Sequence, residues 1–125
     1  MNLTLWIVAS VLAVVFAMAG LTKLTLPREK LPESMAAVKE LSPGTIKFIG
    51  AVELLGALGL ILPAVFDVAV FLTPLAAAGL AVTMLLAALT HARRGESQLI
   101  VVNVVLLALA ASVAVMRFGP QPLSA

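Results

Sequence analysis

The feature that most constrains this chain is a series of four long apolar runs, each with the length of a membrane span. They cover residues 3–24, 45–62, 68–90 and 98–116. At about 1.5 Å per residue, a helix of roughly 20 residues crosses the hydrocarbon core of a bilayer and satisfies its own backbone hydrogen bonds there, which an open strand cannot do. The first run lacks the positively charged start of a signal peptide, so we expect it to stay a membrane helix. The sequence therefore predicts an all-α, polytopic four-helix membrane bundle, with residues 1–125 as a single domain.

The composition excludes an ordinary water-soluble enzyme. Hydrophobic residues make up 62% of the chain and charged residues 11%, whereas soluble domains have roughly 45–50% and about 25%. The chain has no cysteine and one histidine, so it lacks the usual nitrogen and sulfur ligand set of a metal site. We therefore expect neither a metal nor a covalent cofactor.

The positive charges are unevenly placed along the chain. Of the eight lysines and arginines, seven lie in or beside the first and third connections: Lys23, Arg28, Lys30, Lys39, Lys47, Arg93 and Arg94. The positive-inside rule places these connections in the cytoplasm and both termini outside. The excess of positive charge therefore indicates how the chain is oriented in the membrane. No aromatic or glycine-rich readout motif accompanies it, so we expect no nucleic-acid partner.

Helix ends are predicted from local signals. Ser42 and Pro43 have the pattern of an N-cap and first turn for the second helix, and Pro63 is expected to end that helix. Asp67 is the expected cap of the third helix, and Pro74 is expected to kink it.

The first connection has a helical pattern of its own. Its apolar residues Leu31, Met35, Val38 and Leu41 follow helical spacing. This predicts a short amphipathic helix on the cytoplasmic membrane surface, acting either as a lid over the bundle or as a passive linker.

Glu53 is the most informative single residue. It lies about 10 Å from the cytoplasmic end of the second run, and ionisable groups inside a membrane are candidates for function by default. Its helical neighbours Gly50, Gly56 and Ala57 are small, and such faces pack against other helices. We therefore expect Glu53 to point into the bundle. The alternative is a structural Glu that makes one interhelical hydrogen bond.

Each of the other helices places a polar residue at a similar depth. These residues are Lys23 in the first helix, His91 in the third and Asn103 in the fourth, and their convergence predicts a polar pocket in the cytoplasmic half. The candidate catalytic residues are Glu53, Lys23 and His91, and the candidate ligand-binding residues are Glu53, Gly20, Thr83 and Asn103. Each also has a simpler interpretation. Lys23 could snorkel to the headgroups, His91 could be interfacial, Asn103 could link two helices, and Thr83 could bond its own helix.

Four segments together resemble a known family. They are Ala19-Gly20-Leu21-Thr22-Lys23-Leu24, Gly50-Ala51-Val52-Glu53-Leu54-Leu55-Gly56, Ala87-Ala88-Leu89-Thr90-His91 and Asn103. Their order and spacing are similar to the DoxX-like family of small bacterial four-helix membrane proteins. The resemblance implies the bacterial plasma membrane. It also implies a link to redox complexes, because the family is named after a membrane subunit of a thiosulfate:quinone oxidoreductase and some members are linked to oxidative stress. Without cysteine, any thiol chemistry has to reside in a partner or a ligand.

The leading functional hypothesis is a pocket for a small hydrophobic molecule, such as a quinone or an isoprenoid, in a subunit of a redox complex. Glu53, Lys23 and His91 would then meet the polar head. An acid–base enzyme acting on a lipid-soluble substrate is one alternative. An assembly role is another, with small-residue faces that support a homodimer or bind a redox-complex partner. A proton-coupled small transporter is disfavoured because the first run has no acid and the chain has no tyrosine.

Overall fold

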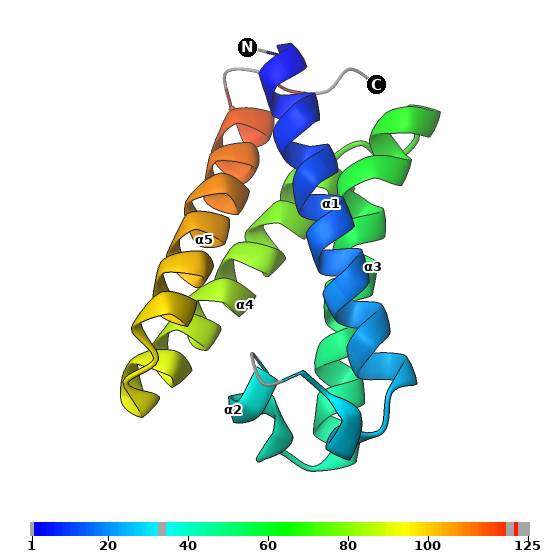
Figure 1. The fold of residues 1–125 in the computed structure, drawn as a ribbon. Helices are drawn as coiled ribbons and strands as arrows, with labels where there is room; N and C mark the ends of the chain where they lie inside the picture. The colour runs from blue at the N-terminus through cyan, green and yellow to red at the C-terminus, as the bar shows by residue number, and fades with distance from the viewer. Residues whose placement is uncertain (1, 33–34, 120–121, 123–125) are drawn as a thin grey trace.

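Each apolar run forms one long helix in the computed structural model, which describes residues 2–32, 35–119 and 122, apart from the side chain of Ala37. The helices are α1 (Asn2–Thr25), α3 (Pro43–Phe66), α4 (Leu72–Arg94) and α5 (Ser97–Phe118) (Figure 1). All four are long and apolar enough to cross a membrane. No strand occurs among the described residues. The prediction of an all-helical, multi-pass membrane protein is confirmed.

The first connection contains two short helical segments, the 3-10 helix η1 (Arg28–Lys30) and the helix α2 (Ala36–Lys39). The continuous amphipathic helix expected here is not supported. Pro32 disfavours helical geometry at the preceding residue, and Leu31 is accordingly extended, with φ −66° and ψ 146°. Residues 33 and 34 of the predicted helix lie outside the described part of the chain. Leu31 is nevertheless buried, so the connection packs against the bundle.

The second long helix begins as predicted but ends later. Ser42 Oγ accepts a hydrogen bond from the backbone N–H of Thr45 at 3.3 Å, and a proline follows in the first turn. Pro63 does not end the helix, which continues to Phe66. A proline leaves the carbonyl four residues earlier without its helical partner. Here that carbonyl belongs to Gly59, and the Thr73 hydroxyl of α4 donates to it at 3.2 Å.

The start of α4 also differs from the prediction. Asp67 does not cap this helix. It ends α3 in the left-handed region, at φ 54°. Since α4 begins at Leu72, Pro74 lies in its first turn, where a missing N–H leaves no helical bond unmade. The kink predicted from Pro74 is therefore wrong.

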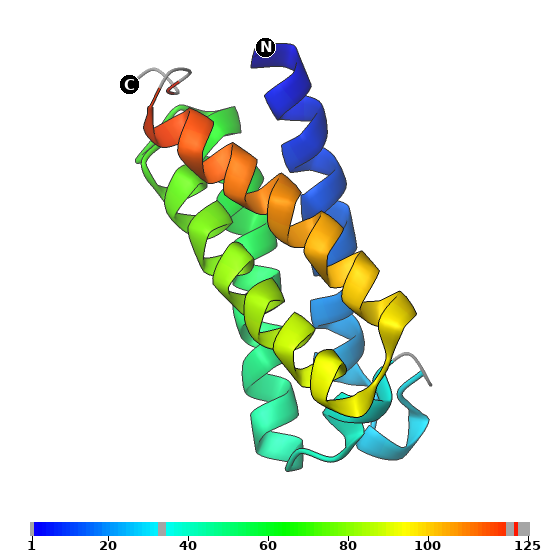
Figure 2. The same ribbon diagram turned by 90° about the vertical axis from the view of Figure 1, so that its left-hand side faces the viewer.

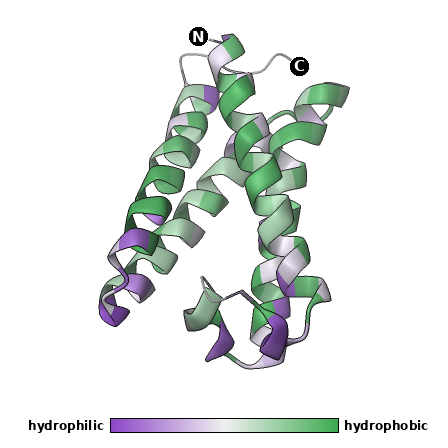
Figure 3. Cartoon of the chain, viewed as in Figure 1, coloured by the Kyte–Doolittle hydropathy of each residue, from purple (hydrophilic) through white to green (hydrophobic). Residues whose placement is uncertain are grey.

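The four helices pack as two pairs, α1 with α3 and α4 with α5, and the pairs are joined mainly between α3 and α4. The pairs diverge away from the termini, and α2 lies at the end where they are farthest apart (Figure 1). In the turned view, α4 and α5 lie in front of the other pair (Figure 2). The buried core between them is formed by Leu12, Phe16, Leu60, Leu80 and Val113. Hydrophilic residues gather at the end that holds the first and third connections, while the helices between are largely hydrophobic (Figure 3). These core residues lie mainly in the half of the bundle nearer the termini.

Candidate functional site

A buried ion pair joins α1 to α3. Lys23 Nζ donates to Glu53 Oε1 at 2.5 Å, and the two residues are only 7% and 3% exposed. The prediction that Glu53 points into the bundle is confirmed. The snorkelling interpretation of Lys23 is wrong, because its ammonium group turns inward to the carboxylate.

Two glycines set the distance between these side chains. Gly20 and Gly50 each lie three residues before a partner of the ion pair, so each stands about one helical turn away from it. A Cβ atom on Gly20 would lie 2.7 Å from the carbonyl oxygen of Gly50, and one on Gly50 would lie 2.8 Å from that of Gly20. The backbones of α1 and α3 therefore touch at this crossing, as only glycine allows. Gly20 packs in the crossing and does not line the neighbouring cavity.

A cavity of about 330 Å³ lies beside the ion pair, between α3, α4 and the first connection. Its polar lining residues are Lys23, Glu53, Thr83, Thr90 and His91, and its apolar ones are Val38, Leu41, Phe48, Ile49, Val52, Met84, Leu86 and Ala87. Apolar walls with a few convergent polar groups are typical of small-molecule sites, and this volume is near the lower end of their range of about 300–1,000 Å³. The cavity suits a small head group better than an entire long-chain lipid.

The rim of the cavity is apolar and open. Phe48 of α3 is 69% exposed and Leu86 of α4 is 60% exposed, although both line the cavity. Val38 and Leu41 of the first connection are only half-exposed and form another part of the wall. The cavity is thus covered by the connection at one side and reaches the outer surface of the helices at another.

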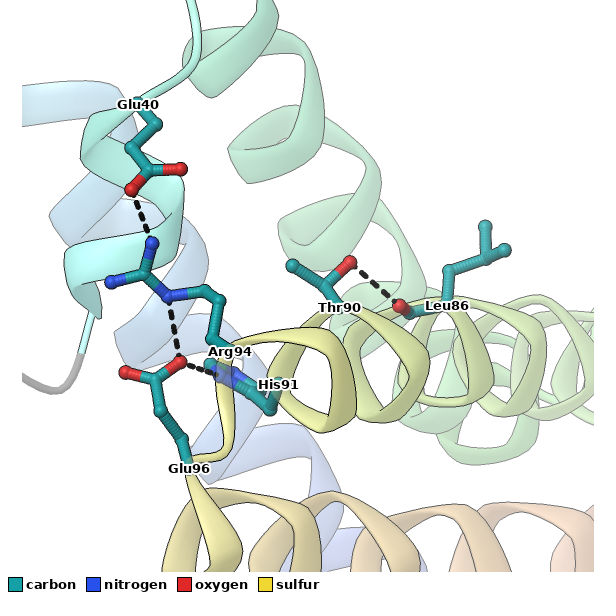
Figure 4. A network of polar contacts seen from close by, with 6 residues as sticks. All are labelled: Glu40, Leu86, Thr90, His91, Arg94 and Glu96. Atoms are coloured by element: carbon teal, nitrogen blue, oxygen red, sulfur yellow. Dashed lines mark hydrogen bonds and ion pairs between the residues drawn. The ribbon is translucent and has the colours of Figure 1, made fainter.

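A chain of polar contacts links the cavity to the first connection (Figure 4). His91 Nδ1 lies 2.9 Å from Glu96 Oε1, and Arg94 Nε donates to the same oxygen at 2.9 Å. Arg94 Nη1 also pairs with the carboxylate of Glu40, just after α2. The hydrogen bond from His91 lowers the pKa of Glu96, because it stabilises the carboxylate, and Arg94 adds to this effect.

The remaining predicted site residues lie around this centre. Thr83 Oγ1 donates to the Gly79 carbonyl of its own helix at 3.0 Å, as expected, and also lines the cavity. Asn103 is buried behind Met84, and its Nδ2 contacts the Met84 sulfur at 3.5 Å. Its Oδ1 is buried without a hydrogen-bond partner among the described residues. Asn103 therefore reaches the cavity only through Met84.

The sequence interpretation missed two groups of residues. Glu40 and Glu96 were not singled out. Glu96 directly follows Gly95, whose φ of 70° marks the end of α4, and the turn brings Glu96 back to His91. At the opposite end of the bundle, Arg117 is buried and donates to Asn2 Oδ1 at 2.6 Å. Within the described residues, no group of three or more His, Cys, Asp or Glu side chains is arranged to hold a metal ion.

Four membrane-length helices around a buried Lys–Glu pair define a small multi-pass membrane protein with a candidate ligand site inside its bundle. The family model described as the DoxX-like family matches residues 7–113, a range that includes both partners of the ion pair, His91 and Asn103. The chain belongs to the DoxX-like family, which confirms the resemblance predicted from its four short segments. Neither curated proteins nor solved structures give a match.

Proposed function

We propose that this DoxX-like protein binds a small hydrophobic molecule through its polar head in the cavity beside Lys23 and Glu53. The observation that carries the proposal is the buried ion pair at the wall of an otherwise apolar cavity. Removing two charges from water is costly, and a well-packed apolar pair would stabilise a bundle equally well or better. A charged pair placed inside a membrane protein is therefore better explained by a ligand than by stability.

The polar atoms of the pair have bonding capacity left for a head group. Lys23 Nζ has three N–H donors, and a carboxylate has two acceptor oxygens, yet their mutual bond uses one donor and one oxygen. No other hydrogen bond of these two side chains occurs within the described part of the chain. A head group in the cavity is expected to contact Lys23, Glu53 and His91, with Thr83 beside it. Asn103 would support the site from behind Met84. Gly20 would keep α1 close enough to α3 for the ion pair to form.

A quinone- or isoprenoid-like molecule is the ligand class that suits the shape. The cavity volume accommodates a head and the first part of a tail. The exposed apolar rim at Phe48 and Leu86 supports access from the bilayer, with the rest of the tail lying against lipid. Val38 and Leu41 line the cavity from the first connection, which supports a role for this connection as a lid at the membrane surface.

We also infer the setting of the site. The cations at the connection end support a cytoplasmic position for that end and external termini, and family membership supports the bacterial plasma membrane. A homodimer or a partner in a redox complex would contact the lipid-facing sides of the helices.

An acid–base enzyme acting on a lipid-soluble substrate is the second candidate. The observation that favours it is the 2.5 Å contact between an ammonium group and a carboxylate at the cavity wall. Such a pair can hold a proton and pass it to a bound substrate.

Mass spectrometry of co-purified small molecules tests the binding proposal. Protein extracted gently from membranes is compared as wild type, Glu53→Gln and the control Glu29→Gln, which removes an exposed acid in η1 away from the cavity. We expect a hydrophobic molecule enriched with the wild type and the control and lost from Glu53→Gln. Because Glu53→Gln leaves the Lys23 ammonium group buried without its carboxylate and is expected to lower stability, the comparison is made in a detergent in which far-UV circular dichroism shows all three proteins to be folded. The same molecules in all three samples, or none in the wild type, would contradict the proposal.

A further inference from the structure

The only histidine of the chain is held in one orientation by the turn between α4 and α5. Its Nδ1 lies 2.9 Å from Glu96 Oε1, and its side chain is 12% exposed while it lines the cavity. No hydrogen bond to Nε2 occurs among the described residues. One ring nitrogen is thus occupied by the turn, and the other is left for the cavity.

The charge of Glu96 decides which nitrogen carries the proton. A carboxylate can only accept hydrogen bonds, so the nitrogen that faces it must bear a hydrogen. Arg94 Nε donates to the same oxygen, which keeps Glu96 in its ionised form. A neutral imidazole has one N–H, and when this is at Nδ1, Nε2 is an acceptor.

The surrounding charges do not work against this arrangement. Arg94 is itself paired with Glu40 next to α2, so the guanidinium lies between two carboxylates. Across the cavity, Lys23 and Glu53 neutralise each other. Two further cations belong to the elements near His91. They are Lys39 in α2 and Arg93 in α4, and the Arg93 side chain is exposed.

We propose that Glu96 fixes His91 as the Nδ1–H form, so that Nε2 presents a hydrogen-bond acceptor to the cavity and selects head groups that carry a hydroxyl. This inference rests on the proposed function and adds the ligand chemistry. The opposite requirement comes from Lys23, whose free N–H groups need an acceptor oxygen. A hydroxyl group offers both a donor hydrogen and an acceptor oxygen. An ether or a ketone of the same shape lacks the donor and leaves Nε2 unpaired. Among the proposed ligands, a quinol or an isoprenoid alcohol therefore fits this arrangement better than an oxidised quinone. Glu96 is a positioning residue in this arrangement.

The tautomer can be measured directly, because a single histidine gives a single set of ring signals. Protein labelled with ¹⁵N-histidine in lipid nanodiscs is examined by NMR over a series of pH values, and the tautomer is assigned from the spectra in which one ring nitrogen is unprotonated. We expect a protonated Nδ1 and a bare Nε2 in the wild type. Glu96→Ala should lose this pattern, and Glu96→Gln, which keeps an acceptor oxygen, should restore most of it. Glu29→Gln is the control and should match the wild type. A wild type with its proton on Nε2, or a pattern unchanged in Glu96→Ala, would overturn the inference.

The selectivity is tested with two probes of matched shape, 4-hexylphenol and 4-hexylanisole, titrated at equal concentrations in the membrane. The His91 ¹⁵N shifts report binding. In the wild type we expect the phenol to bind about tenfold more tightly than the ether, as for one buried hydrogen bond, and this preference should shrink to about twofold or less in Glu96→Ala. Equal binding of both probes to the wild type would overturn the hydroxyl selection and leave the cavity function standing. No binding of either probe would overturn both.

Discussion

The crossing at Gly20 and Gly50 predicts that one added methyl group loosens both the bundle and its ion pair. In Gly20→Ala, the new Cβ would lie 2.7 Å from the Gly50 carbonyl oxygen and 2.9 Å from the backbone nitrogen of Leu54. Both obstacles are backbone atoms of α3, so neither can rotate away. Ordinary contact begins at 3.4 Å, and α1 and α3 therefore have to separate by about 0.7 Å, the difference between 3.4 and 2.7 Å.

The expected net loss is about 1–2 kcal/mol in the free energy of unfolding. Overpacking a tight site costs about 1–3 kcal/mol, and the upper part of this range applies because the backbone cannot give way. Alanine recovers roughly 0.5–1 kcal/mol through its better helix propensity. Gly79→Ala is the matched control, since Gly79 lies in α4 with nothing within 4 Å of an added Cβ. Its stability should stay the same or rise by up to about 1 kcal/mol.

The assay is unfolding by sodium dodecyl sulfate in mixed micelles, followed by far-UV circular dichroism. Gly20→Ala should unfold at a lower detergent fraction than the wild type, whereas Gly79→Ala should not. Because Lys23 follows Gly20 by one turn, Gly20→Ala should also retain less of any co-purified ligand. A Gly20→Ala protein as stable as the wild type would refute the close crossing. Equal losses in both variants would show that the effect does not depend on this contact.

Three further predictions concern charge and backbone strain. Lys23→Met should destabilise the bundle by about 3 kcal/mol, because it leaves the Glu53 carboxylate buried and unpaired, and the double variant with Glu53→Leu should recover most of this loss in the same assay. The lowered pKa of Glu96 means that the folded state binds this proton less readily than the unfolded chain. Its stabilising contribution is therefore complete above the ordinary pKa of 4.5 and is lost as the pH falls through the folded-state value. Unfolding measured from pH 7 to about pH 3 should show an acid-induced loss that is smaller in Glu96→Gln. Ala69 has a left-handed φ of 48°. Ala69→Gly should raise the free energy of unfolding by about 0.5 kcal/mol, because the backbone strain that it relieves exceeds the extra entropy that glycine loses on folding. A thermal or detergent midpoint below that of the wild type would contradict this prediction.

The spans were predictable because hydrocarbon leaves so few alternatives. A run of apolar residues that enters a bilayer has to be helical, and the structure confirms all four helices. Their ends were less predictable because they depend on contacts between helices. Pro63 carries the signal of a helix end, but the Thr73 hydroxyl from α4 bonds the carbonyl that the proline leaves free. No residue near Pro63 in the sequence indicates this hydrogen bond from Thr73.

Some residues of the site could be predicted from their depth in the membrane. Residues that join the site through contacts between distant parts of the chain could not. Lys23, Glu53, His91 and Asn103 were selected as polar residues at a similar depth in the membrane. The first three line one cavity, whereas Asn103 lies behind Met84. Glu40 was not selected, because it is 54 residues away from its partner Arg94 and belongs to a connection without a regular pattern.

The pairing of Lys23 with Glu53 does have a signal in the sequence, although it is visible only once both helices are considered together. Each charged residue follows a glycine by three positions, and each glycine lies on the same face of its helix as the charge. Two helices that cross at their glycines approach closely enough for backbone contact. Because α1 and α3 run in opposite directions (Figure 1), Lys23 lies against Gly50 while Gly20 lies against Leu54, next to Glu53, and the long Lys23 side chain spans the turn that separates it from the carboxylate. A Gly-x-x-Lys in one span and a Gly-x-x-Glu in the next, at the same depth, therefore predict an interhelical ion pair. Either motif alone would predict only a small-residue face or a lone buried charge.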